Sequence, residues 1–410
     1  MGGGDPGAGA VRLAGPARLL SVGSFLMFFD RFSMAPMLIP IARDLRAPLA
    51  AVTAIATVYF VLYGAMQLGY GLLSDRVGRV RLMRVTCVGA ALGGLVSAAA
   101  PSLPVLLVGR ALTGGLVCAL FPSALTYLGD RFPFEVRQRA IADLLTAVAL
   151  GTASASFGAG LLAGSVGWRA AFLLPALALL WLGFALRRLP ESLPARLAPA
   201  GGGAVRRLGG AVRRPWVAFL CAVALPEGAA ILGFLTFLAP ALEAHGTPPA
   251  VAGLITGTYG LAVLAGSRLV RVLAGRVQAW ALIMGGGCCL LAAFTAAALR
   301  QSAPAVLAAS LLVGLAYSTM HSTFQTWATE VAPDARGTAT ALFATSAFAG
   351  AGLATAGLAG LAGAGDYARL FWIGVLVTVP TVAIGAAGRS RFPEGVTASP
   401  AAAPGRGAGT

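Results

Sequence analysis

The sequence predicts an all-α integral membrane protein in which twelve transmembrane helices form two pseudo-symmetric six-helix bundles. Its composition, its long apolar segments and an internal repeat support this prediction. Of the 410 residues, 58% are hydrophobic and only 11% are charged, and the mean hydropathy is +0.83. Soluble globular chains usually carry about 25% charged residues. The composition therefore excludes an ordinary soluble protein and indicates many spanning helices.

Twelve segments are long and apolar enough to cross a bilayer, which takes about 20 residues of helix. They cover residues 17–41, 50–74, 82–100, 103–128, 139–164, 168–187, 215–241, 249–270, 277–299, 303–328, 336–363 and 366–387. Most connections are short, but 188–214 is polar, basic and rich in Gly. The predicted domains are a cytoplasmic tail over 1–16, a six-helix bundle over 17–187, a cytoplasmic linker over 188–214, a second bundle over 215–388 and a disordered cytoplasmic tail over 389–410.

The distribution of arginine predicts the orientation. The net charge is +16, and all basic residues are arginine. With both termini in the cytoplasm, 23 arginines lie in cytoplasmic segments, five lie in outer loops, and Arg31 and Arg110 lie within spans. Cytoplasmic loops of membrane proteins carry such an excess of positive charge. The charge is thus explained by the membrane, we expect no nucleic-acid partner, and we place the protein in the plasma (inner) membrane.

The two halves of the chain resemble each other. Pro40, Pro48 and Tyr59 match residues of the same type 200 positions later, and Gly78 and Arg79 match residues 197 positions later. The nearly constant offset over more than 100 residues indicates a duplication. Each copy holds six spans, so the copies have the same orientation and are related by an axis along the membrane normal.

The loop after the second span carries the most specific motif. It reads "GYGLLSDRVGRVRLMR" and contains, in order, Gly71, Leu73, Asp75, Arg76, Gly78, Arg79 and Arg81. This pattern resembles the loop signature of the major facilitator superfamily, whose twelve-span members export drugs or metabolites. The resemblance implies that Asp75 docks on the start of the eleventh span, near Gly337 and Thr338. It also implies that Arg79 contacts Asp130 and that these gating contacts hold an outward-facing form.

The fifth span contains a degenerate form of a motif found in drug-exporting members of that family. The segment "GTASASFGAG" keeps small residues at Gly151, Ala155, Ser156, Ala159 and Gly160 but lacks the proline of the pattern. Small residues on one helix face allow close packing of a neighbouring helix. We therefore expect a tight helix contact here.

Ionisable groups deep in the spans are the candidate proton-binding or substrate-binding residues, because they are costly in a membrane. They are Asp30, Arg31, Arg110, Glu227 and His321. The repeat places Asp30 and Glu227 within one helical turn of each other on spans 1 and 7. Asp30 either binds a proton or substrate in a water-filled cavity or forms a structural ion pair with Arg110 or Arg31. For His321, neutral packing and a place in the cavity are both open.

Several polar residues are further candidates for lining a cavity, although aromatic packing is the default for each tyrosine. They are Tyr59, Tyr63, Gln67, Tyr259, Tyr317 and Gln325.

These features predict a secondary transporter that works by alternating access. We expect proton-coupled export of a hydrophobic or cationic compound; the alternative is uptake of a sugar or organic anion, with Arg31 and Arg110 binding the anionic group. The chain has no Lys and therefore no phosphate-binding loop of the G-x-x-x-x-G-K-[ST] type. The five cysteines and two histidines show no metal-ligand spacing. We expect no enzyme activity, no cofactor, no bound metal and a monomer.

Overall fold

The computed structural model describes residues 6–192, 209–273 and 275–393; within these ranges the side chains of 6–14, 71, 72, 75, 134 and 135 are not described. The described part of the chain consists of helices and short connections, without strands. Eleven of its helices are long and apolar enough to span a membrane, and a bent pair, Gly15–Phe32 and Ala35–Asp44, raises the number to twelve. The prediction of a twelve-span all-α membrane protein is confirmed.

The first six spans are built from the following elements: α1 (Pro6–Phe32), η1 (Ala35–Met37) and α2 (Leu38–Asp44); α3 (Leu49–Val52) and α4 (Ala54–Val77); α5 (Arg79–Ala98); α6 (Leu103–Val117) and α7 (Leu120–Arg131); α8 (Phe134–Ser165); α9 (Trp168–Ala185) with η2 (Leu186–Arg188). Helix α1 begins at Pro6, within the segment expected to be a tail. The expected linker lies mostly outside the described residues, which resume at 209.

The second six spans follow the same plan: α11 (Pro215–Gly228), η3 (Ala229–Gly233), η4 (Phe234–Phe237) and α12 (Leu238–Glu243); α13 (Pro249–Leu273); α14 (Ala279–Leu299); α15 (Ala303–Ala316), η5 (Tyr317–His321) and α16 (Ser322–Glu330); η6 (Pro333–Ala335), α17 (Arg336–Gly357) and α18 (Ala359–Gly363); α19 (Tyr367–Arg391). The expected C-terminal tail is described only as far as residue 393.

Breaks occur at matching places in the two halves. The short helix α2 starts at Leu38 and α12 starts at Leu238, each after a turn of 3-10 helix. The fourth span breaks after Val117 and the tenth after Ala316. In the second half, the breaks at η3 and η5 are π-helical turns. Turns of this kind interrupt the regular i→i−4 bonding and are frequent at functional sites.

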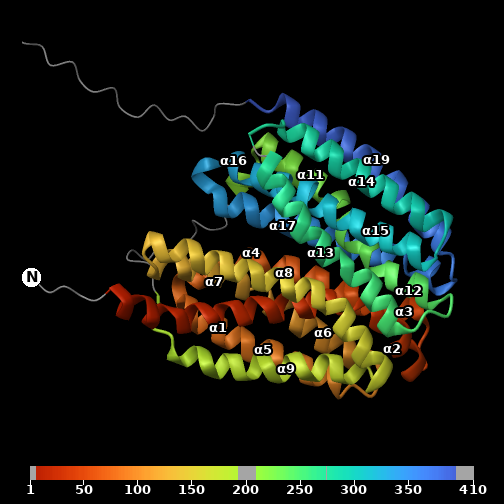
Figure 1. Cartoon of the computed structure of the whole chain (residues 1–410), viewed down its shortest axis with the longest axis horizontal. Helices are drawn as coiled ribbons and strands as arrows, with labels where there is room; N and C mark the ends of the chain where they lie inside the picture. Colours follow the sequence, from red (N-terminus) through yellow and green to blue (C-terminus); the bar gives the residue numbers. More distant parts are fainter. Residues whose placement is uncertain (1–5, 193–208, 274, 394–410) are drawn as a thin grey trace, which may run out of the picture.

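The two halves form two layers (Figure 1). Helices of residues 6–192 make one layer and those of 209–393 make the other, and the start of α1 and the end of α19 lie at the same end of the molecule. We call this end the terminal end; the opposite end, which carries α2, α3 and α12, is the distal end. The layers contact each other along α8 with α13 and along α4 with α17. At the distal end, η1 and α2 also contact α12.

The contact between α8 and α13 depends on the absence of side chains. A Cβ on Gly160 would collide with the Pro249 backbone, and one on Gly253 would collide with the Ser156 backbone. The backbones can approach this closely only because both positions are glycine. The tight contact expected for the small residues of the fifth span is therefore present, and its partner is the eighth span.

This packing gives a first testable expectation. Gly253→Val should lower the thermal midpoint of unfolding in detergent, because overpacking a close contact typically costs about 1–3 kcal/mol. Gly285→Val is the matched control, since a Cβ on Gly285 would meet no atom within 4 Å. Equal midpoints for the two variants would contradict the proposed role of the α8–α13 contact.

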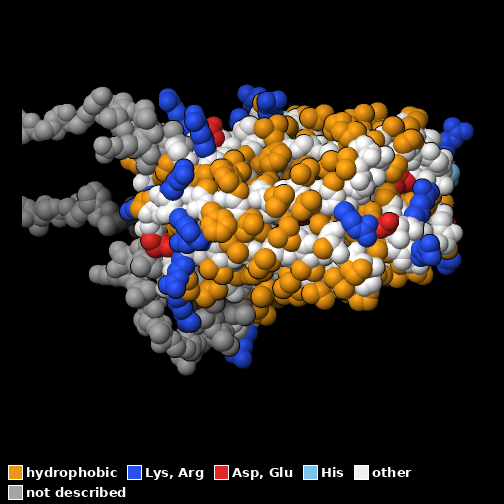
Figure 2. Space-filling view, turned by 90° about the horizontal axis from the view of Figure 1, so that it is seen from below, with side chains coloured by type: hydrophobic (Ala, Val, Ile, Leu, Met, Phe, Trp, Pro, Cys, Tyr) orange, Lys and Arg blue, Asp and Glu red, His pale blue; other side chains and the backbone are white. Residues whose placement is uncertain are grey.

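The surface has a broad hydrophobic band bordered by basic side chains (Figure 2). Many large apolar residues of the spans are exposed, among them Val85, Leu150 and Leu376. An exposed apolar surface of this extent requires a nonpolar surrounding. The blue side chains gather mainly toward the terminal end, with a smaller group at the distal end.

Candidate functional site

A buried ion pair joins the first and fourth spans. Arg110 donates from Nη1 to Oδ1 of Asp30 at 2.8 Å and from Nη2 to Oδ2 at 3.2 Å. Arg110 is fully buried and Asp30 nearly so. The guanidinium also lies over the rings of Tyr59 and Phe172, 4.6 and 4.9 Å from their centroids. The structure thus contains the structural alternative for Asp30: both carboxylate oxygens are bonded, and the residue does not face an open cavity.

The neighbouring Arg31 has a different environment. Its guanidinium carbon lies 4.4 Å from the Phe28 ring centroid, 4.4 Å from that of Tyr63 and 5.1 Å from that of Phe348. It donates to the Tyr63 hydroxyl, while its Nε has no hydrogen-bond partner. Arg31 is 7% exposed, and no carboxylate of the described residues forms an ion pair with it. We call Arg31 with these three rings the Arg31 box.

An acid and a histidine meet in the second half. The Nδ1 atom of His321 lies 2.7 Å from Oε1 of Glu227, and the Oε2 atom of Glu227 has no hydrogen-bond partner. Glu227 is completely buried and His321 is 9% exposed. The imidazole stacks on Tyr317 at 4.6 Å and lies 5.5 Å from Phe343. One hydrogen-bonded proton lies between the acid and the imidazole, whichever of them holds it.

The π-helical turns position this pair. Glu227 immediately precedes η3, and His321 is the last residue of η5. Pro226, within α11, has no N–H to donate to the helix. These interruptions lie where the two side chains meet, and π-helical turns of this kind are frequent at functional sites.

Two tyrosines lie close to both Arg31 and Glu227. Tyr259 and Tyr317 both lie within electrostatic range of Arg31 and of Glu227. Their rings contact each other edge to face with centroids 6.1 Å apart. Arg31 belongs to one layer and Glu227 to the other, so the tyrosines lie where the layers meet. The centre therefore brings Arg31 of one layer and Glu227 of the other close to the same two tyrosines.

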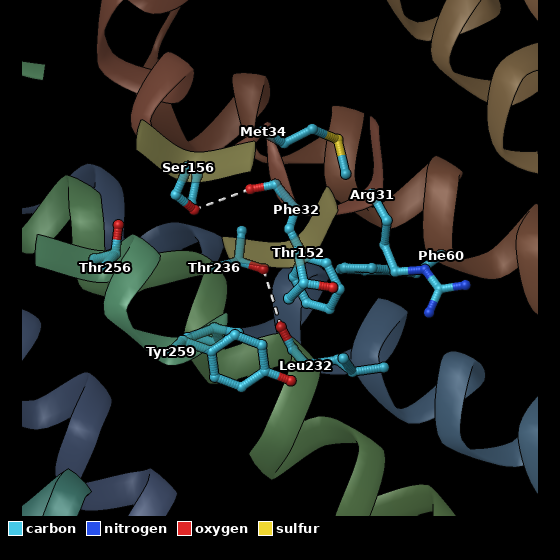
Figure 3. A pocket seen from close by; sticks show the side chains of 12 residues that line it. Arg31, Phe32, Met34, Phe60, Thr152, Ser156, Leu232, Thr236, Thr256 and Tyr259 are labelled. Atoms are coloured by element: carbon cyan, nitrogen blue, oxygen red, sulfur yellow. Dashed lines mark hydrogen bonds between the residues drawn. The ribbon is translucent and has the colours of Figure 1, made fainter. Parts of the chain in front are cut away.

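A small cavity lies beside Arg31 and Tyr259 (Figure 3). Its volume is about 30 Å³, which is about the space that one water occupies in the liquid. Its lining comprises Arg31, Phe32, Met34, Ala35, Phe60, Thr152, Ser156, Leu232, Leu235, Thr236, Thr256 and Tyr259. Ser156 donates to the Phe32 carbonyl at 3.1 Å, which ties α8 to α1. Pockets for drug-sized ligands measure about 300–1,000 Å³, so this cavity is closed to such a molecule.

The remaining predicted cavity residues differ in their surroundings. Tyr59 and Tyr63 are buried beside Arg110 and Arg31, and the Tyr59 hydroxyl has no hydrogen-bond partner. Gln67 is half-buried with an unpartnered Oε1, and Gln325 is exposed. Tyr59 and Tyr63 therefore act with the arginines, whereas Gln325 does not join the cluster.

The loop between the second and third spans forms a charged cluster at the terminal end. The Nε atom of Arg79 lies 3.2 Å from Oδ2 of Asp130, which is the contact that the family resemblance implies. Gly78 has φ +99°, in the region that favours glycine, and a Cβ there would collide with Glu191. Arg76 is exposed. Gly71 and the side chain of Asp75 lie outside the described side chains, so docking of Asp75 near Gly337 stays a prediction.

Two residues at the end of the first half complete this cluster. Glu191 accepts hydrogen bonds from the backbone N–H groups of Val80 and Arg81, each at 2.9 Å. Ser192 donates to Asp130 at 2.9 Å. A carboxylate at the start of α5 satisfies free amides and interacts favourably with the helix dipole. The segment following the sixth span thus fixes the loop that follows the second.

The structure also contains a buried acid that the sequence did not single out. Glu243, at the end of α12, is 4% exposed, and neither of its carboxylate oxygens has a hydrogen-bond partner. The repeat pairs position 243 with position 43, and Arg43 lies on α2 within electrostatic range. The two halves therefore place an acid and an arginine at equivalent positions of the distal end.

The fold and this site define a class of protein: a membrane transporter that moves small molecules between two helical bundles. The model of the Major Facilitator Superfamily matches residues 20–396, so the chain belongs to this family. Its members are secondary transporters and not enzymes, and this chain is a multi-pass membrane transporter of that type. Among the described residues, no group of three His, Cys, Asp or Glu side chains could hold a metal ion.

Individual relatives cover only part of the chain. The multidrug efflux pump LfrA of Mycolicibacterium smegmatis is 33% identical over 178 residues, which are 42% of this chain and 35% of that protein. The putative niacin/nicotinamide transporter NiaP of Bacillus subtilis is 32% identical over 123 residues, 30% of this chain and 31% of that protein. The matches thus span about a third of the length of these relatives.

The solved structures agree on the fold. The crystal structure of the nucleoside transporter NupG superposes with a TM-score of 0.79, covering 91% of this chain and 99% of that chain at 13% identity. Identity at this level establishes the shared fold alone.

Proposed function

We propose that this protein is a proton-coupled secondary transporter that exports small hydrophobic compounds across the plasma membrane. The observation that carries the proposal is the Glu227–His321 pair. A carboxylate that is completely buried in a span and bonded to an imidazole is costly to maintain and is typical of proton relays. The free Oε2 atom of Glu227 leaves room for a second hydrogen bond to water when the site opens.

The surroundings of the pair suggest how the proton and the substrate compete. His321 stacks on Tyr317, and Tyr317 borders Tyr259 at the meeting of the layers. An aromatic compound entering between the layers would displace these rings and with them the imidazole. Loss of the Glu227–His321 hydrogen bond would expose the acid to the aqueous side and release its proton. Binding of substrate on one side of the membrane would then alternate with binding of a proton on the other side of the membrane.

The orientation and the state of the protein are part of the proposal. The arginines near the terminal end favour its placement in the cytoplasm, with both termini there. The distal end, where η1 and α2 meet α12, would then face outward, and its packing corresponds to a form closed to the outside. We propose that a monomer suffices, because the site lies between the two halves of one chain.

Export is supported by the similarity to LfrA, which is a multidrug efflux pump. The aromatic lining of the centre, including Phe32, Phe60 and Tyr259, favours hydrophobic compounds. Arg31, which has no acidic partner among the described residues, opposes a cationic substrate. We therefore narrow the proposed substrates to hydrophobic compounds without a permanent positive charge.

A second candidate function is uptake of an aromatic organic anion. The Arg31 box favours it, because an unpaired guanidinium can bind a carboxylate with two parallel hydrogen bonds. NiaP is described as a niacin/nicotinamide transporter, and niacin is a carboxylate on an aromatic ring. Arg110 does not serve this function in the present structure, since Asp30 occupies it.

A panel of substrates separates these functions. The protein is expressed in a strain lacking its own exporters, and accumulation of neutral hydrophobic dyes, hydrophobic cations and aromatic carboxylates is measured. We expect reduced accumulation of the neutral dyes and no effect on the cations. Increased accumulation of aromatic carboxylates would instead support uptake of anions. In that case the uptake should fall at least about tenfold in Arg31→Gln. Arg300→Gln, an exposed distal residue, is the matched control. Unchanged accumulation of every class would refute both functions.

A further inference from the structure

A groove of about 670 Å³ opens at the terminal end of the first half, away from the central site. It lies between α1, α7 and α9 together with η2, and three of its lining residues are Arg18, Arg131 and Arg188. All three arginines are exposed. No Asp or Glu among the residues that the structure describes lines the groove. Its mouth is therefore strongly positive.

The acids nearest in sequence are engaged elsewhere. Asp130, next to Arg131, contacts Arg79 and Ser192. Glu191, three residues after Arg188, accepts from the amides that begin α5. Among the described residues, no carboxylate forms an ion pair with any of the three groove arginines. Their charges are thus available to an external anion.

The rest of the groove is apolar. Leu19, Val22 and Trp181 contribute to its wall, and Val22 and Trp181 are exposed on the membrane-facing surface. The basic border of the hydrophobic band in Figure 2 lies toward the same end of the molecule. Tryptophan and arginine side chains at the border of the hydrophobic band are typical of the region where lipid headgroups lie. A ligand that fits needs an anionic head and an apolar body that can extend along the helices.

We infer that this groove binds an anionic phospholipid, with the phosphate on the three arginines and the acyl chains along Val22 and Trp181. Guanidinium groups match phosphate oxygens with paired hydrogen bonds. A free phosphate would use the arginines but leave the apolar wall uncovered. Basic pockets between helices on the cytoplasmic side are a recognised form of lipid site. This inference does not depend on the substrate or the direction of transport.

The test measures lipid binding to the full-length protein in a neutral detergent by native mass spectrometry. Phosphatidylglycerol, phosphatidylcholine, glycerol phosphate and inorganic phosphate are titrated separately. We expect phosphatidylglycerol to bind at least about tenfold more tightly than the other three. Each Arg→Gln change in the groove should weaken its binding about fivefold, the effect of one basic residue near an anionic lipid. Trp181→Gln should weaken phosphatidylglycerol binding without changing that of glycerol phosphate.

The matched control removes the same charge at the same end of the other half. Arg268, Arg271 and Arg276 are exposed and lie outside the groove. Their combined replacement by Gln should change phosphatidylglycerol binding by less than about twofold. An equal loss in the control and in the groove triple variant would show a general charge effect and overturn the inference. Equally tight binding of inorganic phosphate would overturn it too. If the triple variant does not fold, Arg188→Gln alone gives the same comparison with Arg271→Gln.

Discussion

Glu227→Gln will abolish accumulation of substrate driven by a proton gradient but will leave exchange of substrate across the membrane intact. Glutamine keeps the size of the side chain and can still bond to His321, but it cannot release a proton. A gradient of two pH units supplies about 2.7 kcal/mol per coupled proton, which corresponds to about a 100-fold concentration ratio. In the variant this ratio should fall to about one.

The measurement uses purified protein in liposomes, with and without an imposed pH gradient. Retained exchange without a gradient shows that the variant is folded and binds substrate. Glu330→Gln is the matched control. Glu330 is the last residue of α16, far from the centre, and forms an ion pair with Arg389. Gradient-driven accumulation that persists in Glu227→Gln would rule out this acid as the coupling group.

Arg110→Met will destabilise the protein strongly, by about 3–5 kcal/mol, because it leaves the Asp30 carboxylate buried without a partner. Combining it with Asp30→Leu should recover most of this loss, since no charge is then left buried. Unfolding in detergent gives the four stabilities of a double-mutant cycle. If the Arg110→Met variant is as stable as the parent, water must reach Asp30, and the ion pair is then dispensable for stability.

The exposed pair of Arg214 and Asp334 is the control for this cycle. Its two hydrogen bonds are each 2.6 Å long, shorter than those of Asp30 with Arg110, and they raise the pKa of the Arg214 guanidinium. Solvent nevertheless screens the interaction, so its removal should change the unfolding midpoint little. Comparing the stability losses of the buried pair and the exposed pair tests whether burial, rather than hydrogen-bond length, causes the loss.

The fold could be predicted in detail because membrane spans are read from local composition. Length and hydropathy give the spans, and the repeat gives their grouping, as the matching breaks at Leu38 and Leu238 illustrate. The family motif also implied the contact of Arg79 with Asp130. Glu191 lies in the predicted linker of 188–214, and its role at the start of α5 could not be predicted because it depends on where that helix begins in space.

The site was predicted less completely, because side-chain partners depend on helix rotation and packing. The sequence identified the five ionisable residues but left the partners of Asp30 and His321 open. Phe348 of the Arg31 box belongs to the eleventh span, and nothing local distinguishes it from other membrane phenylalanines. Glu243 was missed because it ends an apolar segment, where a charged residue is expected to reach water.

The pairing of Asp30 with Arg110 affects how the protein responds to the membrane potential. The pair carries no net charge, so the central charge is set by Arg31 and by the Glu227–His321 pair. An ionised Glu227 beside a neutral His321 would balance the charge of Arg31, and in the proposed cycle one proton taken up by the pair would give the centre one positive charge. A membrane potential of 100 mV performs up to about 2.3 kcal/mol of work on such a charge. The voltage would therefore favour the proton-loaded form facing the negative side and help to drive proton delivery there.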